Sequence, residues 1–339
     1  MKRSDTLLLA HGSGGRLTHE LVRQVFLPAF DNPYLRTLSD SAVLAELPQG
    51  RPAMTTDAFV VDPVVFPGGD LGYLSVCGTV NDLAVAGARP LWLTWALVLE
   101  EGLEGELLHT LVEGAARACR EAGVTLVAGD TKVVPRGKGD RAFAISSGLG
   151  VVPVGRDLGD HRVQVGDDLV ISGPFGDHGA TIMACRHGMS GSALVSDCAP
   201  LGHLAECVLS SGAEIHAMHD PTRGGVATTC HEVAMRADLR FVLDEAALPL
   251  RSETLTTCEL LGLDPLYLAC EGRMLIWVAP RDTERLLQTL RRHPLGRDAA
   301  WIGRAEPRQD GPVAVLLKTT IGGERPVDLL SGSELPRIC

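Results

Sequence analysis

The sequence predicts a two-domain protein that mixes strands and helices, an α/β (α+β) fold, followed by a short tail. Three observations support this fold class. The chain has 339 residues, which is long for a single hydrophobic core. Apolar runs of strand length alternate with helical periodicity in both halves of the chain. Residues 151–160, VVPVGRDLGD, break both patterns. We therefore expect domains over residues 1–152 and 153–324, and a flexible tail over 325–339.

The first half contains two strongly periodic helical segments. Apolar residues recur at helical spacing from 70 to 88, where Gly87 and Pro90 stop the pattern, and again over 104–122, which Gly123 closes. Residues 42–60 predict a hairpin around a Pro-Gln-Gly turn. Further strands are expected over 92–100, 124–130 and 141–152, and an earlier helical pattern follows the glycines of 11–15.

The same alternation resumes after the connecting segment. Strands are expected over 168–172, 214–218, 239–243 and 273–279, near 300, and over 313–318. Helices are expected near 177–187 and over 200–211, 224–237, 252–261 and 282–292, with Ser252 as the N-cap of the fourth. The last stretch, GGERPVDLLSGSELPRIC, has no periodicity and many helix breakers, which predicts a tail.

Composition excludes several classes of protein. The formal charge of −11 disfavours a nucleic-acid binder, because affinity for phosphate backbones comes mainly from Lys and Arg. The apolar run near the N-terminus is too short for a secretory signal, and no stretch approaches a membrane span. The 9 cysteines are scattered and form no C-x-x-C, which disfavours disulfides or zinc and favours a reducing cytoplasm. Cys77, Cys119 and Cys230 have the apolar neighbours of core residues.

Several acids occur at or near predicted strand ends. Asp57 ends one strand, Asn81 and Asp82 lie within the first long helical pattern, and Asp130 and Lys132 follow another strand. Any one of these acids could be a capped or salt-bridged structural residue. Together they are expected to converge on one edge of a sheet, where carboxylates that meet phosphates hold Mg²⁺. Lys132 would then suit a nucleotide phosphate.

Three glycine-rich turns are able to bind anions. They are HGSGG at 11–15, SGPFGDHGA at 172–180, and HDPTRGG at 219–225, which contains Thr222, Gly224 and Gly225 before a helix. For the first of them alone, a flexible entry loop is the better explanation. No Gly-Lys-Ser/Thr follows any of them, so none is a Walker A loop. His219 lies in the third turn, and Glu271 precedes a strand where a carboxylate could act as a base or remain a surface acid.

Six motifs together resemble one family: HGSGG, TTDAFVV, TVNDLAVAGA, AGDTKVV, HDPTRGG and the terminal PRIC. They look like the carbamoyl dehydratase of [NiFe]-hydrogenase maturation, the HypE family. That family lies within the superfamily of aminoimidazole ribonucleotide synthetase, selenophosphate synthetase and thiamine-monophosphate kinase. The resemblance implies the two-domain synthetase fold, with a mixed sheet and helices in the N-terminal domain, which would bind ATP and dimerise.

The resemblance also implies a reaction. A partner carbamoyltransferase carbamoylates the terminal cysteine, which Cys339 matches. ATP then activates the carboxamide, and loss of phosphate leaves an S-cyanide that passes to iron on a maturation scaffold complex. By motif match, Asp57, Asp82 and Asp130 would hold Mg²⁺ and Lys132 would steady the γ-phosphate. The resemblance assigns Asn81, Thr222, Gly224 and Gly225 to positioning nucleotide or tail, Glu271 and His219 to proton handling, and the whole chain to a homodimer.

Two alternatives remain. A small-molecule ATP-dependent kinase or synthetase of the same superfamily would not need its tail, and a nucleotide-sensing scaffold would bind ATP without modifying Cys339. The set of acids predicted to hold Mg²⁺ argues against a nucleotide-sensing scaffold, which has less need of several carboxylates. The first glycine-rich segment, AHGSGG, contains no cysteine, whereas selenide-activating relatives carry Cys or selenocysteine there, which counts against selenophosphate synthesis. Arg337 is expected to offset the charge of the terminal carboxylate.

Overall fold

The computed structural model describes residues 2–189, 193–309, 314–330 and 337–339, and its chain divides into two compact units. The first unit comprises Met1–Leu83, Ala88–Val154 and Cys339. The second comprises Ala84–Gly87 and Gly155–Ile338.

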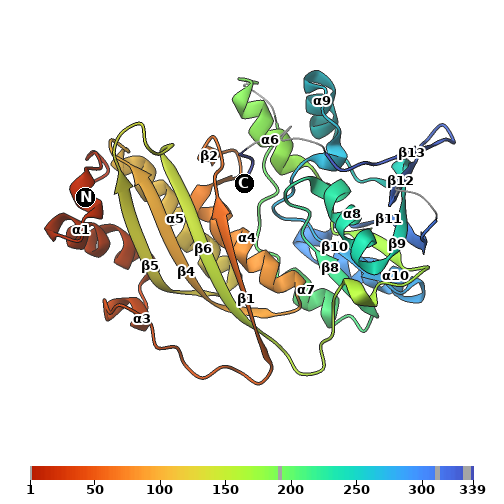
Figure 1. The fold of residues 1–339 in the computed structure, drawn as a ribbon, viewed down its shortest axis with the longest axis horizontal. Helices are drawn as coiled ribbons and strands as arrows, with labels where there is room; N and C mark the ends of the chain where they lie inside the picture. Colours follow the sequence, from red (N-terminus) through yellow and green to blue (C-terminus); the bar gives the residue numbers. More distant parts are fainter. Residues whose placement is uncertain (1, 190–192, 310–313, 331–336) are drawn as a thin grey trace. The chain divides into compact units, whose positions relative to one another are not determined.

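A four-stranded mixed sheet forms the centre of the first unit (Figure 1). Its order is β1-β6-β4-β5, with β4 and β5 parallel and the other neighbours antiparallel. The strands are β1 (Arg51–Phe59), β4 (Arg89–Glu100), β5 (Thr125–Val134) and β6 (Ala142–Val152), and a separate ribbon pairs β2 (Val65–Phe66) with β3 (Gly69–Asp70).

Two long helices, α4 (Leu71–Val85) and α5 (Gly105–Ala122), lie side by side on one face of this sheet (Figure 1). Ser75 of α4 accepts a hydrogen bond from the indole of Trp95 in β4 at 2.9 Å, and its carbonyl accepts one from Ser146 in β6. Cys77 of α4 and Cys119 of α5 are buried, as their apolar neighbours predicted. Both helices match the sequence expectation to within a residue or two, because their apolar spacing and glycine stops are strong signals.

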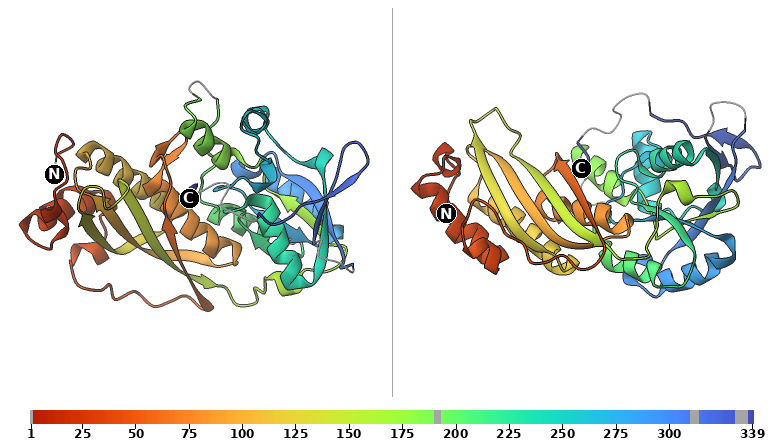
Figure 2. Two further views of the ribbon diagram at one scale, coloured as in Figure 1. Left: turned by 45° about the horizontal axis from the view of Figure 1, so that its top comes forward. Right: turned by 60° about the horizontal axis from the view of Figure 1, so that its bottom comes forward.

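The N-terminal segment is helical and lies beside β5, as Figure 2 shows from two further directions. Its parts are a 3₁₀ turn η1 (Leu9–Gly12), α1 (Arg16–Leu21), a π-helical stretch η2 (Val22–Phe26), α2 (Leu27–Phe30) and α3 (Pro33–Arg36). Phe26 and Phe30 pack their rings against Trp95, with centroids 6.4 and 5.9 Å away. This segment therefore uses the same face of the sheet as α4 and α5.

The hairpin expected over 42–60 is wrong. Only its second half is a strand, β1, which pairs with β6 instead of with residues 42–48. Residues 42–48 form no strand and are largely exposed, with Val43 89% accessible. An apolar run without a partner strand cannot satisfy its backbone groups in a sheet.

The second unit is built on a sheet with seven strands in the part of the chain that the structure describes. Their order is β13-β12-β9-β11-β7-β10-β8. Only β12 and β9 are parallel among its neighbouring pairs. The strands are β7 (Asp168–Ile171), β8 (Ile215–His219), β9 (Leu239–Asp244), β10 (Leu275–Val278), β11 (Ala300–Pro307), β12 (Val315–Lys318) and β13 (Glu324–Pro326).

Helices cover both faces of this sheet. α8 (Gly225–Ala237) shares one apolar cluster with alternate residues of the strands, and Cys230 lies buried within it as predicted. α7 (Gly202–Leu209) and α10 (Thr283–Arg291) share the other cluster. The remaining helices are α6 (Asp177–Arg186), α9 (Ser252–Leu261) and the 3₁₀ turns η3 (Asp160–Arg162), η4 (Glu245–Ala247), η5 (Pro265–Tyr267), η6 (Pro280–Asp282) and η7 (Pro294–Gly296).

Two expectations at the ends of these elements need correction. Ser252 is the first residue of α9 rather than its N-cap, which is Arg251 without a side-chain cap. Residues 324–326, expected in or beside the tail, form β13 and pair antiparallel with β12. Backbone pairing with an available edge strand gives order to a segment whose sequence has no periodicity. No helix among the described residues is long and apolar enough to cross a membrane.

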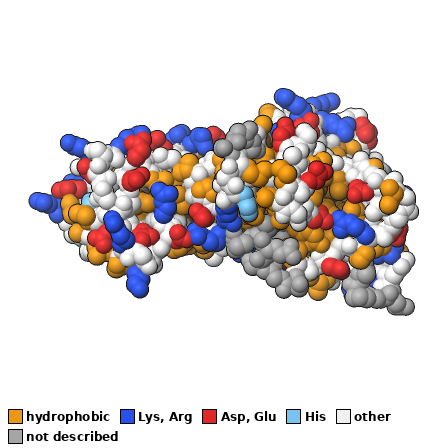
Figure 3. Space-filling view, turned by 90° about the horizontal axis from the view of Figure 1, so that it is seen from above, with side chains coloured by type: hydrophobic (Ala, Val, Ile, Leu, Met, Phe, Trp, Pro, Cys, Tyr) orange, Lys and Arg blue, Asp and Glu red, His pale blue; other side chains and the backbone are white. Residues whose placement is uncertain are grey.

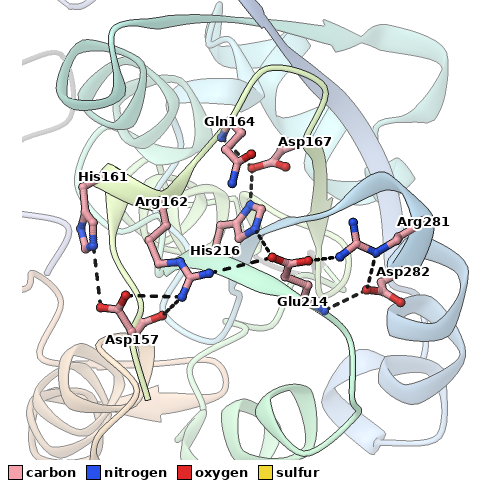
Figure 4. A network of polar contacts seen from close by, with 9 residues as sticks. All are labelled: Asp157, His161, Arg162, Gln164, Asp167, Glu214, His216, Arg281 and Asp282. Atoms are coloured by element: carbon pink, nitrogen blue, oxygen red, sulfur yellow. Dashed lines mark hydrogen bonds and ion pairs between the residues drawn. The ribbon is translucent and has the colours of Figure 1, made fainter. Parts of the chain in front are cut away.

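The start of the second unit is fastened by a polar network (Figure 4). The buried imidazole of His216 in β8 lies 2.6 Å from Asp167 and 3.3 Å from Glu214. Glu214 also pairs with Arg281, and Arg162 pairs with Asp157. Because each charged group here has partners from other elements, the network has a structural explanation. Elsewhere, acidic and basic side chains are interspersed on the face seen in Figure 3.

Candidate functional site

Two of the predicted carboxylates belong to one face of the N-terminal sheet. Thr55 and Asp57 are two residues apart in β1 and therefore share one face of the sheet. This is the face that α4 covers, because Asp57 is paired with Ser146, whose hydroxyl donates to α4. Asp82 of α4 accepts a hydrogen bond from Thr55 Oγ1 at 2.7 Å. Both carboxylates are half-buried. Hard oxygen donors of this kind suit Mg²⁺, which keeps waters and takes one or two carboxylates together with substrate phosphates.

Asp130 and Lys132 belong to the opposite face of the same sheet. The strand expected to end at Asp130 continues to Val134, so both residues lie inside β5 rather than past it. Asp130 is opposite Ala96, one position out of phase with the face that carries Asp57. Lys132 Nζ lies 3.0 Å from Asp130, and both side chains are exposed. The structure thus does not place the three predicted magnesium ligands on one face, and no cluster of three potential ligands occurs among the described residues.

A cavity of about 310 Å³ opens between the N-terminal helices and β5. Its walls are mainly apolar and aromatic, and Gly129, Asp130 and Thr131 form part of its polar lining. The aromatic residues that line it are Phe26, Phe30, Tyr34 and Trp95. A partly enclosed apolar cavity with a few polar groups is the usual form of a small-molecule site, and this volume is at the lower end for such sites. Asn81, by contrast, is wholly buried within α4.

Three segments that are far apart in the sequence converge in the second unit. The glycine-rich turn at 172–180 bonds to the Glu271 segment, since Gly179 N–H donates to Ala269 at 3.0 Å and Gly176 N–H to Cys270 Sγ at 3.2 Å. The turn at 219–225 joins them through Cys270 N–H, which donates to Pro221 at 3.0 Å. The structure therefore brings two of the predicted glycine-rich turns together around Glu271.

Three buried acids and an arginine lie at this junction. Glu271 is 1% exposed, and its N–H donates to Asp197 at 3.1 Å. Asp197 pairs with Arg273 at 3.6 Å, and Asp177 accepts a hydrogen bond from Thr254 at 2.6 Å. Burial raises the pKa of both Asp177 and Asp197, although Arg273 opposes the rise at Asp197. Buried acids with raised pKa values are typical of sites that handle protons.

The Gly224-Gly225 turn is required by the backbone itself. Both residues have positive φ, 75° and 60°, as α8 begins. A Cβ at Gly225 would lie 2.6 Å from the carbonyl of Leu266. Thr222 is half-buried and its carbonyl accepts the Gly225 N–H.

His219 ends β8 beside a carboxylate. Its Nε2 lies 2.6 Å from Asp160, which Arg236 also contacts. Burial alone would raise the pKa of Asp160, but His219 and then Arg236 outweigh it and lower that pKa. The proton-handling role predicted for His219 would have to compete with this pairing.

The end of the chain returns to α6. The carbonyls of Arg337 and Ile338 accept hydrogen bonds from Arg186 and His178, and the side chain of Ile338 is buried. Cys339 is half-buried.

Sequence reasoning missed five residues of the C-terminal site: Asp177, His178, Ser196, Asp197 and Arg273. The Asp177-His178 pair inside a glycine-rich turn was a usable signal, because polar residues there often face a ligand. Ser196 and Asp197 had no signal in a single sequence, since their partners His178 and Glu271 lie 18 and 74 residues away along the chain.

Comparison with known families agrees with the fold. The N-terminal domain model of AIR synthase related proteins matches residues 38–152, and the C-terminal domain model matches residues 164–315. The fold and paired domains therefore define an AIR synthase related protein.

Closer relatives identify the branch. The chain is 48% identical to carbamoyl dehydratase HypE of Rhodobacter capsulatus, over 99% of both chains. It matches a crystal structure of hydrogenase maturation protein HypE in complex with ATP with a TM-score of 0.94 and 44% identity, covering 98% of this chain and 100% of the other. A chain from a HypE-HypF complex matches with a TM-score of 0.79 and 40% identity, covering 93% and 100%. The chain thus belongs to the carbamoyl dehydratase HypE family, as its motifs predicted.

Proposed function

We propose that this protein is an ATP-dependent carbamoyl dehydratase of hydrogenase maturation and that its own Cys339 carries the substrate. The main observation behind the proposal is that the end of the chain is hydrogen-bonded to α6. The terminal cysteine follows two residues whose main chain is bound beside a buried acidic cluster. Similarity over 99% of the chain to HypE proteins supports the activity, and similarity to a HypE–ATP complex supports the nucleotide.

The proposed reaction balances as a dehydration driven by ATP. A carbamoyl group on the Cys339 sulfur attacks the γ-phosphorus of ATP through its carboxamide oxygen, and ADP leaves. The nitrogen loses its two protons, one to Glu271 and one to solvent, and the C–O bond breaks, so that inorganic phosphate departs and a C≡N triple bond forms on sulfur. Phosphorylation is required because a carboxamide oxygen is otherwise a poor leaving group.

Apart from His219, each predicted site residue has a task in this scheme. Asp57 and Asp82, which share one face, would hold Mg²⁺ and so neutralise phosphate charge. Asp130, which lines the aromatic cavity beside β5, would contact the nucleotide there. Lys132 would stabilise the negative charge on the transferred phosphoryl group. Glu271 would accept the carboxamide proton, because a buried carboxylate is a stronger base than one in water.

The aromatic cavity beside β5 is the proposed nucleoside site. Its apolar walls suit a purine ring, while Asp130 and Thr131 offer polar groups for a ribose. Thr222 and the Gly224-Gly225 turn remain candidates for positioning the tail. Asn81, wholly buried in α4, would act by supporting Asp82, the next residue of that helix.

Three partners fit this role. A relative's structure in a HypE-HypF complex supports a carbamoyltransferase that loads Cys339. A scaffold complex that holds iron would receive the cyanide. A second copy would pack on the uncovered face of the four-stranded sheet, where Met54 is 76% exposed and Ala58 and Thr56 are also exposed. A reducing cytoplasm suits the thiol, since all nine cysteines are described and none forms a disulfide.

The test is the mass of the C-terminal peptide after incubation with the carbamoyltransferase, carbamoyl phosphate and Mg-ATP. The expected product is Cys339 carrying a carbamoyl group minus one water, formed only with ATP. Glu271→Gln should stop at the carbamoyl adduct. Exposed Cys207 provides an internal control that should stay unmodified.

Two outcomes would count against the proposal. A carbamoyl adduct that never loses water would leave Cys339 a carrier but place dehydration elsewhere. An unmodified Cys339, with the transferase active on another substrate, would favour the small-molecule kinase instead. That kinase would keep its ATP turnover after deletion of residues 336–339.

A further inference from the structure

The last peptide groups of the chain are bound by side chains of α6. His178 Nε2 lies 2.9 Å from the carbonyl oxygen of Ile338, and Arg186 donates to the carbonyl of Arg337. The Ile338 side chain is 4% exposed. A chain end is usually poorly ordered unless something holds it, so these contacts constitute a specific attachment.

The chemistry of the contact determines the tautomer of His178. A carbonyl oxygen only accepts, so Nε2 carries the hydrogen and Nδ1 must be the acceptor. Ser196 Oγ lies 2.8 Å from Nδ1 and donates to it, while accepting the Cys198 N–H at 3.1 Å. Burial lowers the pKa of His178 to about 4, against a smaller rise from the Ile338 contact, so the ring is neutral at pH 7.

Both contacts are made to main-chain carbonyls rather than to the thiol or to any tail side chain. A group attached to the Cys339 sulfur leaves these carbonyls unchanged. These two hydrogen bonds therefore keep the same partners whether the sulfur is free, carbamoylated or cyanated.

We propose that His178, oriented by Ser196 and assisted by Arg186, is a positioning residue that binds the tail main chain and delivers whatever group Cys339 carries to the acidic cluster. We call His178, Ser196 and Arg186 the tail receptor. His178 is adjacent in sequence to Asp177, and Ser196 to Asp197, so the receptor and the acidic cluster are built on the same two segments. The delivery step rests on the proposed function; the binding of the tail does not.

The experiment measures the rate at which iodoacetamide alkylates Cys339 in the full-length chain, read by mass spectrometry of the C-terminal peptide. His178→Leu removes the donor and should raise this rate roughly 10-fold, the effect of one lost buried hydrogen bond. His178→Gln keeps an N–H near the Nε2 position and should stay within a few-fold of the parent. Exposed Cys207 on α7 is the matched internal control and should react equally in every variant.

A tail-side variant separates positioning from folding. Ile338→Asp changes the chain end, outside the two apolar clusters that pack on the sheet of the second unit, and it should also raise the Cys339 rate. Combined with His178→Leu it should give little further increase, because both changes release the same contact. If the rate increases of the two changes multiply in the double variant, His178 and Ile338 do not belong to one contact, and the proposal of a shared receptor is refuted.

Four further outcomes decide the matter. Equal Cys339 rates in the parent, His178→Leu and His178→Gln would overturn the proposal, as would acceleration of Cys207 together with Cys339. Slower loss of water from carbamoylated His178→Leu, with carbamoylation itself unchanged, would support delivery. If the parent is never carbamoylated, the proposed function fails while the alkylation result still tests the receptor.

Discussion

Asp70 provides a quantitative test of the N-terminal unit. This residue ends β3 and caps α4, the helix that carries Asp82, and its carboxylate accepts the Tyr73 N–H at 2.9 Å. Burial raises its pKa to about 6, although the N–H groups of Tyr73 and Gly72 and the charge of Arg117 oppose the rise. The folded protein therefore binds this proton more tightly than the unfolded chain does. Stability from this group is full below pH 3.8 and is lost as the pH rises through 6.

The magnitude follows from the two pKa values. The difference between 6 and 3.8 corresponds to about 3 kcal/mol of stability lost on going from acid to alkaline pH. Asp70→Asn keeps an acceptor for the Tyr73 N–H and cannot ionise. We expect this variant to be more stable than the parent at pH 8 by up to about 3 kcal/mol, an advantage that shrinks by about 1.4 kcal/mol at pH 5.

Urea unfolding at both pH values would measure this difference. Labelling of Cys77 and Cys119, buried in α4 and α5, reports the unfolding of this unit and not of the other. Glu20→Gln, which alters an exposed ion pair of α1 at 3.5 Å, is the control and should change stability by less than about 0.5 kcal/mol. An effect of Asp70→Asn that does not vary with pH, or a loss of stability at pH 8, would refute the reasoning.

Three other predictions concern packing, catalysis and assembly. Gly72→Ala would place a Cβ 1.8 Å from a carbonyl oxygen of α5 and should destabilise the unit by about 2 kcal/mol or more in the same urea assay. The control Gly15→Ala, whose Cβ would have nothing within 4 Å, should leave stability unchanged. Equal effects of the two changes would contradict the close approach at Gly72. Lys132→Met should slow ADP release on the carbamoylated protein roughly 100-fold, whereas Lys138→Met on an exposed turn should leave the rate unchanged. A parent-like rate of ADP release in Lys132→Met would show that Lys132 takes no part in catalysis. Met54→Glu should shift sedimentation from dimer to monomer, and an unchanged dimer would place its interface elsewhere.

The long helices and most strands could be predicted because their signals are local. α5, for example, combines apolar spacing with a left-handed glycine at 123 that closes it. The failed hairpin at 42–60 shows the limit of such signals. Residues 42–48 have strand-like composition, but a strand also needs a neighbour with unpaired backbone groups, and β1 pairs with β6. Which segments pair depends on the whole topology and not on either segment alone.

The candidate site divides in the same way. Asp57, Asp82 and Lys132 were accessible from motifs, because each lies beside a recognisable element. Asp197 and Ser196 were not, because their chemistry comes from contacts with Glu271 and His178, which belong to other elements of the fold. A buried acid becomes visible only when the segments that exclude water from it are in place.

The length of β5 decides how the N-terminal carboxylates are grouped. If the strand had ended at Asp130, this acid could have turned toward the same edge as Asp57. It instead continues to Val134, so the two-residue period of the strand directs Asp130 and Lys132 to the face opposite Asp57 and Asp82. The helix-covered face therefore carries Asp57 of β1 together with Asp82 of α4, while the edge strand β5 carries a carboxylate–ammonium pair, of which Asp130 also lines the aromatic cavity. A metal–phosphate role suits the oxygen-rich first pair, where the Thr55 hydroxyl donates to Asp82, whereas a role against negative charge suits the Lys132 ammonium of the second.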